Sequence, residues 1–220
     1  MFNKNQKDFD IGVINYGINN LQSVNKAFQK ISVRSKWIDT PEDVIKSKAL
    51  VLPGIGAFEY GMKGLRERKL IDAIKKKVSI GTPLLGICLG MQLLFTQSEE
   101  NGLFQGLNLI PGKVVKLKDS HSDIKIPHMG WNNINPKNKN WKNTIIKNTD
   151  AKKHYFYFVH SFFSKPDKEE HILATSTYGE NEFCSVVQYK NILGCQFHPE
   201  KSGEIGLDIL REYSKKLKNQ

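Results

Sequence analysis

The pentapeptide Gly86-Ile87-Cys88-Leu89-Gly90 carries the strongest chemical signal in the sequence. It has the small-x-nucleophile-x-small pattern of a nucleophile elbow, with cysteine at the position that serine often occupies. At such an elbow a strand turns sharply into a helix, and glycines on either side relieve the crowding of the backbone. Cys88 would then lie at a helix N-terminus, which favours the thiolate. The N–H of Leu89 would face a developing oxyanion. Taken alone, the pentapeptide fits a small buried core cysteine equally well.

The second chemical signal is His198-Pro199-Glu200, directly after an apolar strand-like run. Residues i and i+2 of an extended chain project to the same side, about 6–7 Å apart. Pro199 pushes His198 toward extended geometry, so the Glu200 carboxylate can hold the imidazole by its far nitrogen. A base with an orienting carboxylate is the arrangement of a catalytic triad. A surface turn is the alternative for this tripeptide.

A third candidate is the turn Pro53-Gly54-Ile55-Gly56, which follows a buried strand-like run. Backbone N–H groups in a glycine-bearing turn at the carboxyl end of a parallel strand can face an anion. Gly54 or Ile55 could therefore supply a second oxyanion donor beside Leu89. A phosphate loop is disfavoured because no Gly-Lys-Ser/Thr follows, and a plain strand-to-helix turn stays open.

The first half of the chain alternates strand-like and helix-like segments, which must position these groups. Strands are predicted at 11–14, 33–38, 49–52 and 83–87. Apolar residues recur at helical spacing from Leu21 to Phe28, and Thr40-Pro41-Glu42-Asp43 is typical of a helix start. A further helix is predicted from about Leu65 to Lys77. This order predicts an α/β fold whose central, mostly parallel sheet has helices on both faces.

The second half is richer in strands and is predicted to form a smaller antiparallel sheet. Its predicted strands are 113–117, 155–160, 172–177, 184–189 and 192–197. Seven asparagines between Asn132 and Asn148 indicate a surface loop or hairpin. A closing helix is predicted from about Ser202, because apolar residues recur there at four-residue spacing. With 220 residues and no clear linker, we expect a single domain over 1–220.

The composition is that of an ordinary globular protein, and its charge does not point to nucleic acid. The formal net charge is +11, but only four of the 33 basic residues are arginine, the side chain that base reading and bidentate phosphate contacts favour. We therefore interpret the charge as a lysine-rich solvated surface and expect no nucleic-acid partner. Attraction of an acidic partner or an anionic metabolite stays possible.

The three cysteines, Cys88, Cys184 and Cys195, include no Cys-x-x-Cys pair. We expect neither a disulfide framework nor a metal site. No stretch approaches the roughly 18 apolar residues that a membrane span requires. The residues from Met1 to Asp10 lack the apolar segment of a secretory signal, so a cytoplasmic location without a membrane partner is expected.

Taken together, these motifs resemble the class I, or triad, glutamine amidotransferases. The segments Gly86-Ile-Cys-Leu-Gly-Met-Gln92 and Gln196-Phe-His-Pro-Glu-Lys-Ser202 look like the two signatures of that family, in the expected order. Further similarity lies in segments 53–58, 126–132 and 157–161, so the resemblance covers nearly the whole chain. The opening motif departs from the family pattern: Asn15 stands where aspartate is usual, and Asn19 replaces a glycine.

The resemblance implies a three-layer, flavodoxin-like fold and hydrolysis of L-glutamine to glutamate and ammonia without a cofactor. Cys88, His198 and Glu200 would form the triad, with Leu89 and Gly54 or Ile55 lining the oxyanion hole. Gln92 and the segment His160-Ser161-Phe162 would hold the amino-acid end of glutamine. Within the family, the chain looks closest to glutaminase subunits that form heterodimers with a (β/α)₈-barrel cyclase of histidine biosynthesis.

Three other interpretations remain open at the level of sequence. A related glutaminase subunit could supply ammonia to a sugar-modifying amidotransferase. A stand-alone cysteine peptidase or γ-glutamyl hydrolase could use the same fold and the same three side chains. A binding module that has lost the chemistry is disfavoured, because all three triad positions are filled.

Overall fold

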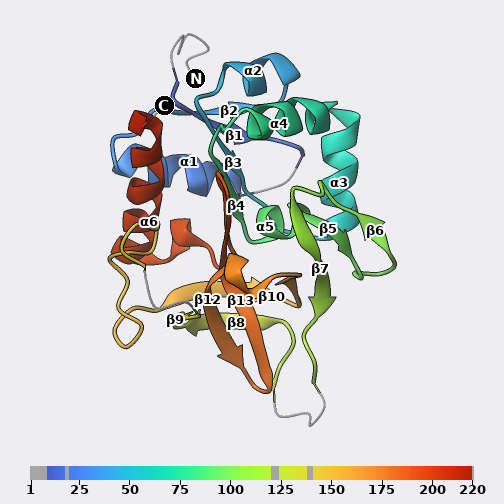
Figure 1. The fold of residues 1–220 in the computed structure, drawn as a ribbon, viewed down its shortest axis with the longest axis vertical. Coiled ribbons are helices and arrows are strands. Elements are labelled where there is room, and N and C mark those ends of the chain that lie inside the picture. Colours follow the sequence, from blue (N-terminus) through green and yellow to red (C-terminus); the bar gives the residue numbers. More distant parts are fainter. Residues whose placement is uncertain (1–8, 18–19, 120–123, 138–140, 220) are drawn as a thin grey trace.

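The structure is a computed structural model that describes residues 9–17, 20–119, 124–137 and 141–219. Its main sheet has the strand order β2-β1-β3-β4-β14-β13-β12-β9 (Figure 1). The first five of these strands are parallel: β1 (Ile11–Ile14), β2 (Ser35–Ile38), β3 (Ala49–Leu52), β4 (Leu84–Ile87) and β14 (Ile192–Cys195). An order that runs 2-1-3-4 and then on to the last parallel strand is the flavodoxin-like order, so the predicted fold class is confirmed.

Helices cover both faces of the parallel strands (Figure 1). The helices are α1 (Leu21–Lys30), α2 (Pro41–Lys46), α3 (Phe58–Glu67), α4 (Leu70–Ser79), α5 (Leu89–Leu93) and α6 (Gly203–Lys215), with short 3₁₀ turns at Glu169–His171, Pro199–Lys201 and Lys216–Asn219. Helices α1 and α6 pack on one face, and α2, α3 and α4 pack on the other. The result is the three-layer arrangement that the alternation of segments predicted.

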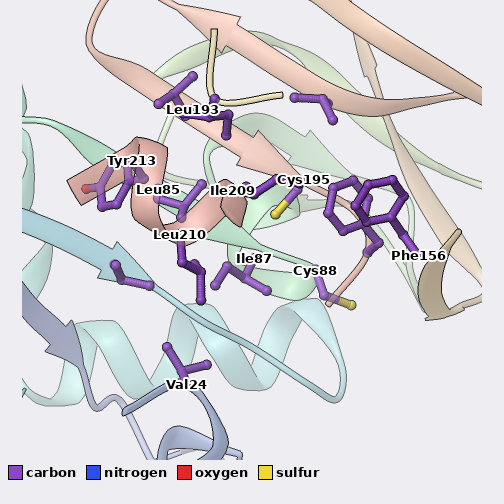
Figure 2. Packing of buried hydrophobic residues seen from close by; sticks show 14 of the residues in the cluster. Val24, Leu85, Ile87, Cys88, Phe156, Leu193, Cys195, Ile209, Leu210 and Tyr213 are labelled. Carbon is purple, nitrogen blue, oxygen red and sulfur yellow. The ribbon is translucent and has the colours of Figure 1, made fainter. Parts of the chain in front are cut away.

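Two hydrophobic clusters form because the parallel strands are buried on both faces. In β1, Val13 packs toward α1 and α6, whereas Ile14 packs toward the opposite helices. Leu85 and Ile87 of β4 belong to the first cluster, in which Figure 2 shows them beside Leu210 of α6. Successive strand residues point to opposite faces, so apolar runs without alternation are required here.

One predicted helix is wrong in its bounds. The segment expected as one helix from Leu65 to Lys77 is divided between α3 and α4, with Lys69 in the left-handed conformation at φ 55°. The start of α3 was missed because two glycines weaken the helical pattern of its first half. Tertiary contacts compensate: Phe58, at the start of α3, is fully buried, and its N–H donates to the Glu100 carboxylate at 2.7 Å.

The second half contributes antiparallel strands to the main sheet and also forms smaller sheets. The strands that extend the main sheet are β13 (Asn181–Tyr189), β12 (Ile172–Tyr178) and β9 (Asn135–Pro136). An antiparallel pair joins β8 (His128–Asn132) to β10 (Phe156–His160). A four-stranded sheet has the order β11 (Phe162–Pro166), β7 (Ile110–Lys116), β5 (Phe95–Ser98) and β6 (Phe104–Gln105). The asparagine-rich segment, expected as a surface loop or hairpin, contains the end of β8 and strand β9, and its residues 138–140 lie outside the described residues.

Among the described residues, no helix is both long and apolar enough to cross a membrane.

Candidate active site

The candidate site lies where the carboxyl ends of three neighbouring parallel strands meet. Strand β4 pairs with β14, with Ile87 opposite Cys195, and the N–H of Cys88 donates to the Cys195 carbonyl at 2.8 Å. Cys88 follows β4 directly, and His198 comes three residues after the end of β14. This pairing brings two segments that are about 110 residues apart to one edge of the sheet, which is where open α/β sheets bind ligands.

Cys88 has the strained backbone that a nucleophile elbow requires. Its φ is 53° and its ψ is −113°, a combination that costs a non-glycine residue free energy. Gly90 permits the turn, because a Cβ at that position would lie 1.7 Å from the Leu52 carbonyl oxygen. Leu89 is the first residue of α5, so its N–H has no carbonyl partner within the helix.

The His198 imidazole is held by a carboxylate, as the spacing predicted. Its Nδ1 lies 2.8 Å from Glu200 Oε1, and both side chains are fully buried. The same carboxylate oxygen accepts a second hydrogen bond, at 2.7 Å, from the Asn20 amide. Asn20 has φ 83° and immediately precedes α1. Sequence reasoning did not single out Asn20, although it ends a segment that follows the first parallel strand at the same sheet edge.

The electrostatic surroundings of His198 favour its protonated form. Burial alone would lower the pKa of His198. The opposing interactions are larger in sum: the electrostatic interaction with Cys88, followed by the hydrogen bond to Glu200 and its charge, raises this pKa to about 10. An imidazole with such a pKa is an imidazolium at neutral pH. Cys88 and His198 therefore interact electrostatically, as a nucleophile does with the acid–base group beside it.

The turn after β3 packs directly against the nucleophile. A Cβ at Gly54 would lie 2.7 Å from Leu89 Cβ and 2.8 Å from the Gly90 nitrogen, so only glycine fits there. The hydroxyl of Tyr16, a buried residue, donates to the Pro53 carbonyl at 2.6 Å and anchors the turn. Ile55 lines the same cleft as Cys88 and Leu89, whereas Gly54 is not among its lining residues.

A cleft of about 410 Å³ opens over Cys88. Its lining residues are Ile55, Gly56, Cys88, Leu89, Gln92, Glu100, Pro127, Tyr157, Val159, His160, Ser161, Phe162 and Lys201. All four residues that the resemblance implied for glutamine binding, Gln92, His160, Ser161 and Phe162, are therefore brought to this cleft. Glu100 was missed, because nothing in its local sequence distinguishes it from a surface acid.

A buried hydrogen-bond network forms the wall of the cleft behind Gln92 and His160. His128 Nδ1 lies 3.1 Å from His160 Nε2, and His160 Nδ1 lies 2.9 Å from the Phe162 carbonyl oxygen. The Gln92 amide donates to the same carbonyl at 2.8 Å. Burial lowers the pKa of His128 to about 4. Burial and the nearby charge of His128 lower that of His160 to about 3.

The remaining cysteines lie in the core. Burial raises the pKa of both the Cys184 and the Cys195 thiols. Cys195 faces the first hydrophobic cluster, at the end of the strand beside Cys88 (Figure 2). Within the described ranges, no cluster of three or more His, Cys, Asp or Glu side chains could hold a metal ion.

Comparison with known proteins agrees with this fold, and it places the chain in a family. The family described as Glutamine amidotransferase class-I matches residues 12–213, so the chain belongs to that family. Among solved structures, one titled as a glutamine amidotransferase superposes with a TM-score of 0.72 at 18% identity, covering 96% of this chain and 99% of that one. PurLQS from Thermotoga maritima has a TM-score of 0.69 at 18% identity, with coverages of 95% and 99%. At that identity the likeness supports the fold alone.

Curated relatives are more similar in sequence and share one name. Imidazole glycerol phosphate synthase subunit HisH 1 of Legionella pneumophila (strain Paris) is 42% identical, over 92% of this chain and 97% of its own length. Imidazole glycerol phosphate synthase subunit HisH of Halalkalibacterium halodurans is 45% identical, with coverages of 92% and 94%. The HisH subunit of Geobacter metallireducens is 42% identical, with coverages of 93% and 97%.

Proposed function

We propose that this chain is the glutaminase subunit of an imidazole glycerol phosphate synthase. It hydrolyses glutamine to glutamate and ammonia and passes the ammonia to a cyclase subunit in histidine biosynthesis. The observation that carries the chemistry is the electrostatic interaction of Cys88, which lines a cleft of about 410 Å³, with a buried His198–Glu200 pair. The shared name of relatives at 42–45% identity supports the pathway over a sugar-modifying acceptor.

The reaction proceeds through a thioester. The Cys88 thiolate attacks the side-chain carbonyl carbon of glutamine, and the carbonyl oxygen becomes an oxyanion that the Leu89 N–H and an N–H of Gly54 or Ile55 stabilise. His198 donates its proton to the departing nitrogen, so ammonia leaves and the thioester forms. Neutral His198 then takes a proton from water, which attacks the thioester and releases glutamate and the thiolate. Loss of one oxyanion donor typically raises the barrier by about 2.7–4 kcal/mol.

Two groups hold the charged end of the substrate in this proposal. Glu100 is the carboxylate among the cleft-lining residues, so it pairs with the α-ammonium of glutamine. Gln92 directs its amide nitrogen to the Phe162 carbonyl and to Gln196 Oε1. Its Oε1 is therefore left as a hydrogen-bond acceptor for the substrate. Asn20 and Glu200 act indirectly, because they hold His198 in place.

The partner surface adjoins the mouth of the cleft. Met129 and Trp131 of β8 are 62% and 58% exposed, and they lie opposite Val159 and Tyr157 of β10, which line the cleft. Large exposed apolar side chains beside a site indicate a protein interface. A cyclase docked here, with the (β/α)₈ barrel implied by the resemblance, would cover the cleft and receive ammonia without loss to solvent.

The decisive experiment uses the full chain with and without the cyclase subunit of its own organism. Cys88→Ala should abolish glutamate release from glutamine, because no other group in the cleft can form the thioester. The variant should retain the circular dichroism spectrum of the wild type and still bind the cyclase. Near-normal glutaminase activity in Cys88→Ala would rule out the mechanism. Wild-type activity that ignores the cyclase and extends to peptides would instead favour a stand-alone hydrolase.

A further inference from the structure

We propose that Gln196 is a positioning residue for the nucleophile: its side-chain amide donates a hydrogen bond to Cys88 Sγ and holds the sulfur as a thiolate facing the cleft. Gln196 Nε2 lies 3.7 Å from this sulfur. This inference rests on the proposed glutaminase function and adds to it a residue that lies two positions before His198. The side chain is fully buried, so no water competes for its amide.

The orientation of the Gln196 amide follows from a chain of hydrogen bonds that allows no other assignment. The Phe162 carbonyl can only accept, so the Gln92 atom 2.8 Å away must be its NH₂ group. The second hydrogen of that NH₂ points to Gln196 at 3.2 Å, which requires Oε1 of Gln196 on that side. The remaining NH₂ group of Gln196 therefore faces Cys88.

The same network is anchored at its other end by the two neutral histidines. His160 donates from Nδ1 to the Phe162 carbonyl at 2.9 Å, which uses the second lone pair of that oxygen. Both lone pairs of the Phe162 carbonyl are then occupied, which fixes its hydrogen bond with Gln92. The backbone of Gln196 is fixed as well, because its N–H donates to the Ser185 carbonyl at 2.9 Å.

Two neighbours of the Cys88 sulfur have opposite preferences for its protonation state. The hydrogen bond from the Gln196 amide is therefore important. The Val159 carbonyl lies 3.8 Å from Sγ and can accept only from the thiol form, so it favours the neutral state. The Gln196 N–H can donate to both forms but binds the thiolate more strongly, because hydrogen bonds to charged acceptors are about twice as strong as neutral ones. Without the Gln196 amide, only His198 would oppose the preference of the Val159 carbonyl for the neutral thiol.

Other titratable groups near Cys88 do not replace this contact. Tyr16 and Cys195 interact electrostatically with Cys88, and burial raises the pKa of both, so they remain protonated at neutral pH. Glu100 and Lys201 line the same cleft, but neither is among the hydrogen-bond partners of the sulfur in the described residues. Among the described residues, the sulfur has hydrogen-bond contacts with Gln196 and the Val159 carbonyl, and it interacts electrostatically with His198.

The test compares Gln196→Met, which removes the donor at similar size, with the matched variant Gln188→Met. Gln188 lies on β13 outside the cleft, and its amide oxygen is buried without a partner among the described residues. Two readouts are used on the full chain: glutaminase kinetics with the cyclase present, and the rate at which iodoacetamide alkylates Cys88, followed by mass spectrometry across pH. The second variant is Gln196→Glu. It also lacks the N–H donor, but it keeps an oxygen that faces the Gln92 amide.

In Gln196→Met, we expect kcat to fall by about 10- to 100-fold while KM for glutamine changes by less than about threefold, since a hydrogen bond to a charged group is lost but substrate contacts remain. Alkylation of Cys88 at neutral pH should slow by about tenfold, and its pH profile should move to higher pH. Gln196→Glu should show a larger loss, because its carboxylate repels the thiolate. Gln188→Met should match the wild type.

Wild-type turnover and wild-type alkylation in both Gln196 variants would overturn the inference. A rise in KM with unchanged kcat and alkylation would also overturn it, because Gln196 would then shape the substrate site and not the sulfur. If the wild type itself released no glutamate, the proposed function would fail. The alkylation comparison would still decide whether Gln196 acts on Cys88, since alkylation does not require turnover.

Discussion

Two buried pairs of side chains contain the histidines near the cleft, His198–Glu200 and His128–His160, and the protonation of their imidazoles differs completely. His198 pairs with Glu200 at 2.8 Å, and its pKa is raised to about 10. His128 pairs with His160 at 3.1 Å, and their pKa values are lowered to about 4 and about 3. All three of these histidines are shielded from solvent, so shielding does not explain the difference.

The partner atoms determine the sign of the shift. Burial lowers the pKa of every one of these imidazoles. For His198, a thiol that can ionise and a carboxylate stabilise the cation and outweigh burial. For His160, the neighbours are another imidazole and a carbonyl, and these do not provide a negative charge. One pair can therefore transfer protons at neutral pH, whereas the other keeps fixed hydrogen-bond roles.

The largest expected effect comes from removing the charge that distinguishes the first pair. Glu200→Gln keeps the size of the side chain but leaves imidazolium without its anion, so kcat should fall by at least about 100-fold. Asn20→Ala, which removes only a hydrogen bond to Glu200, should lower kcat less, by about tenfold. Steady-state glutaminase kinetics with the cyclase check both. Equal effects of the two variants would contradict the idea that charge, and not orientation alone, matters here.

A second prediction separates the thiol from the carboxylate as the cause of the raised pKa. In Cys88→Ala the largest raising influence on His198 is gone while its burial remains, so its pKa should fall from about 10 by more than one unit. Titration of the histidine ring resonances by NMR measures it. Cys184→Ala, a buried cysteine of β13 outside the cleft, provides the control. An unchanged His198 pKa in Cys88→Ala would show that Glu200 alone sets it.

The smallest expected effect concerns stability and the neutral pair. In the unfolded chain, each of these histidines has a pKa of about 6.5. In the folded chain, the pKa is about 4 for His128 and about 3 for His160. The unfolded state thus binds more protons below pH 6.5, so stability should fall as pH drops toward 4, by up to about 1.4 kcal/mol per pH unit for each histidine. Urea unfolding measures this slope. In His128→Phe the slope should be shallower, and an unaltered slope would contradict the assignment.

Sequence patterns predicted much of this architecture because many of its determinants are local. Ile11–Ile14 and Ala49–Leu52 were predicted with the bounds that the structure shows. Their short, continuous apolar runs are typical of a strand that is covered on both faces. The break at Lys69 was not predicted, because no proline or glycine marks it. The left-handed turn there is stabilised by the separate packing of α3 and α4.

The residues of the site also fall into two groups: those that the sequence predicted and those that it did not. Gly86–Gly90 and His198–Glu200 were recognisable because an elbow and an i, i+2 pair depend only on near neighbours along the chain. Their role in catalysis stays a prediction that the Cys88 and Glu200 variants test. Gln196 begins one of the family-like segments, but neither it nor Asn20 nor Glu100 shows a role locally, since each acquires its partner only after the chain has folded.

The sequence by itself determined the local geometry: which segments are buried strands, where a cysteine meets a sharp turn, and which carboxylate can reach the following imidazole. Only the tertiary structure decided that β4 and β14 are neighbours, and that the Gln196 amide faces the sulfur. The physical reason is that backbone propensity and turn sterics act over a few residues, whereas strand order and buried hydrogen-bond direction are set by packing across the whole sheet.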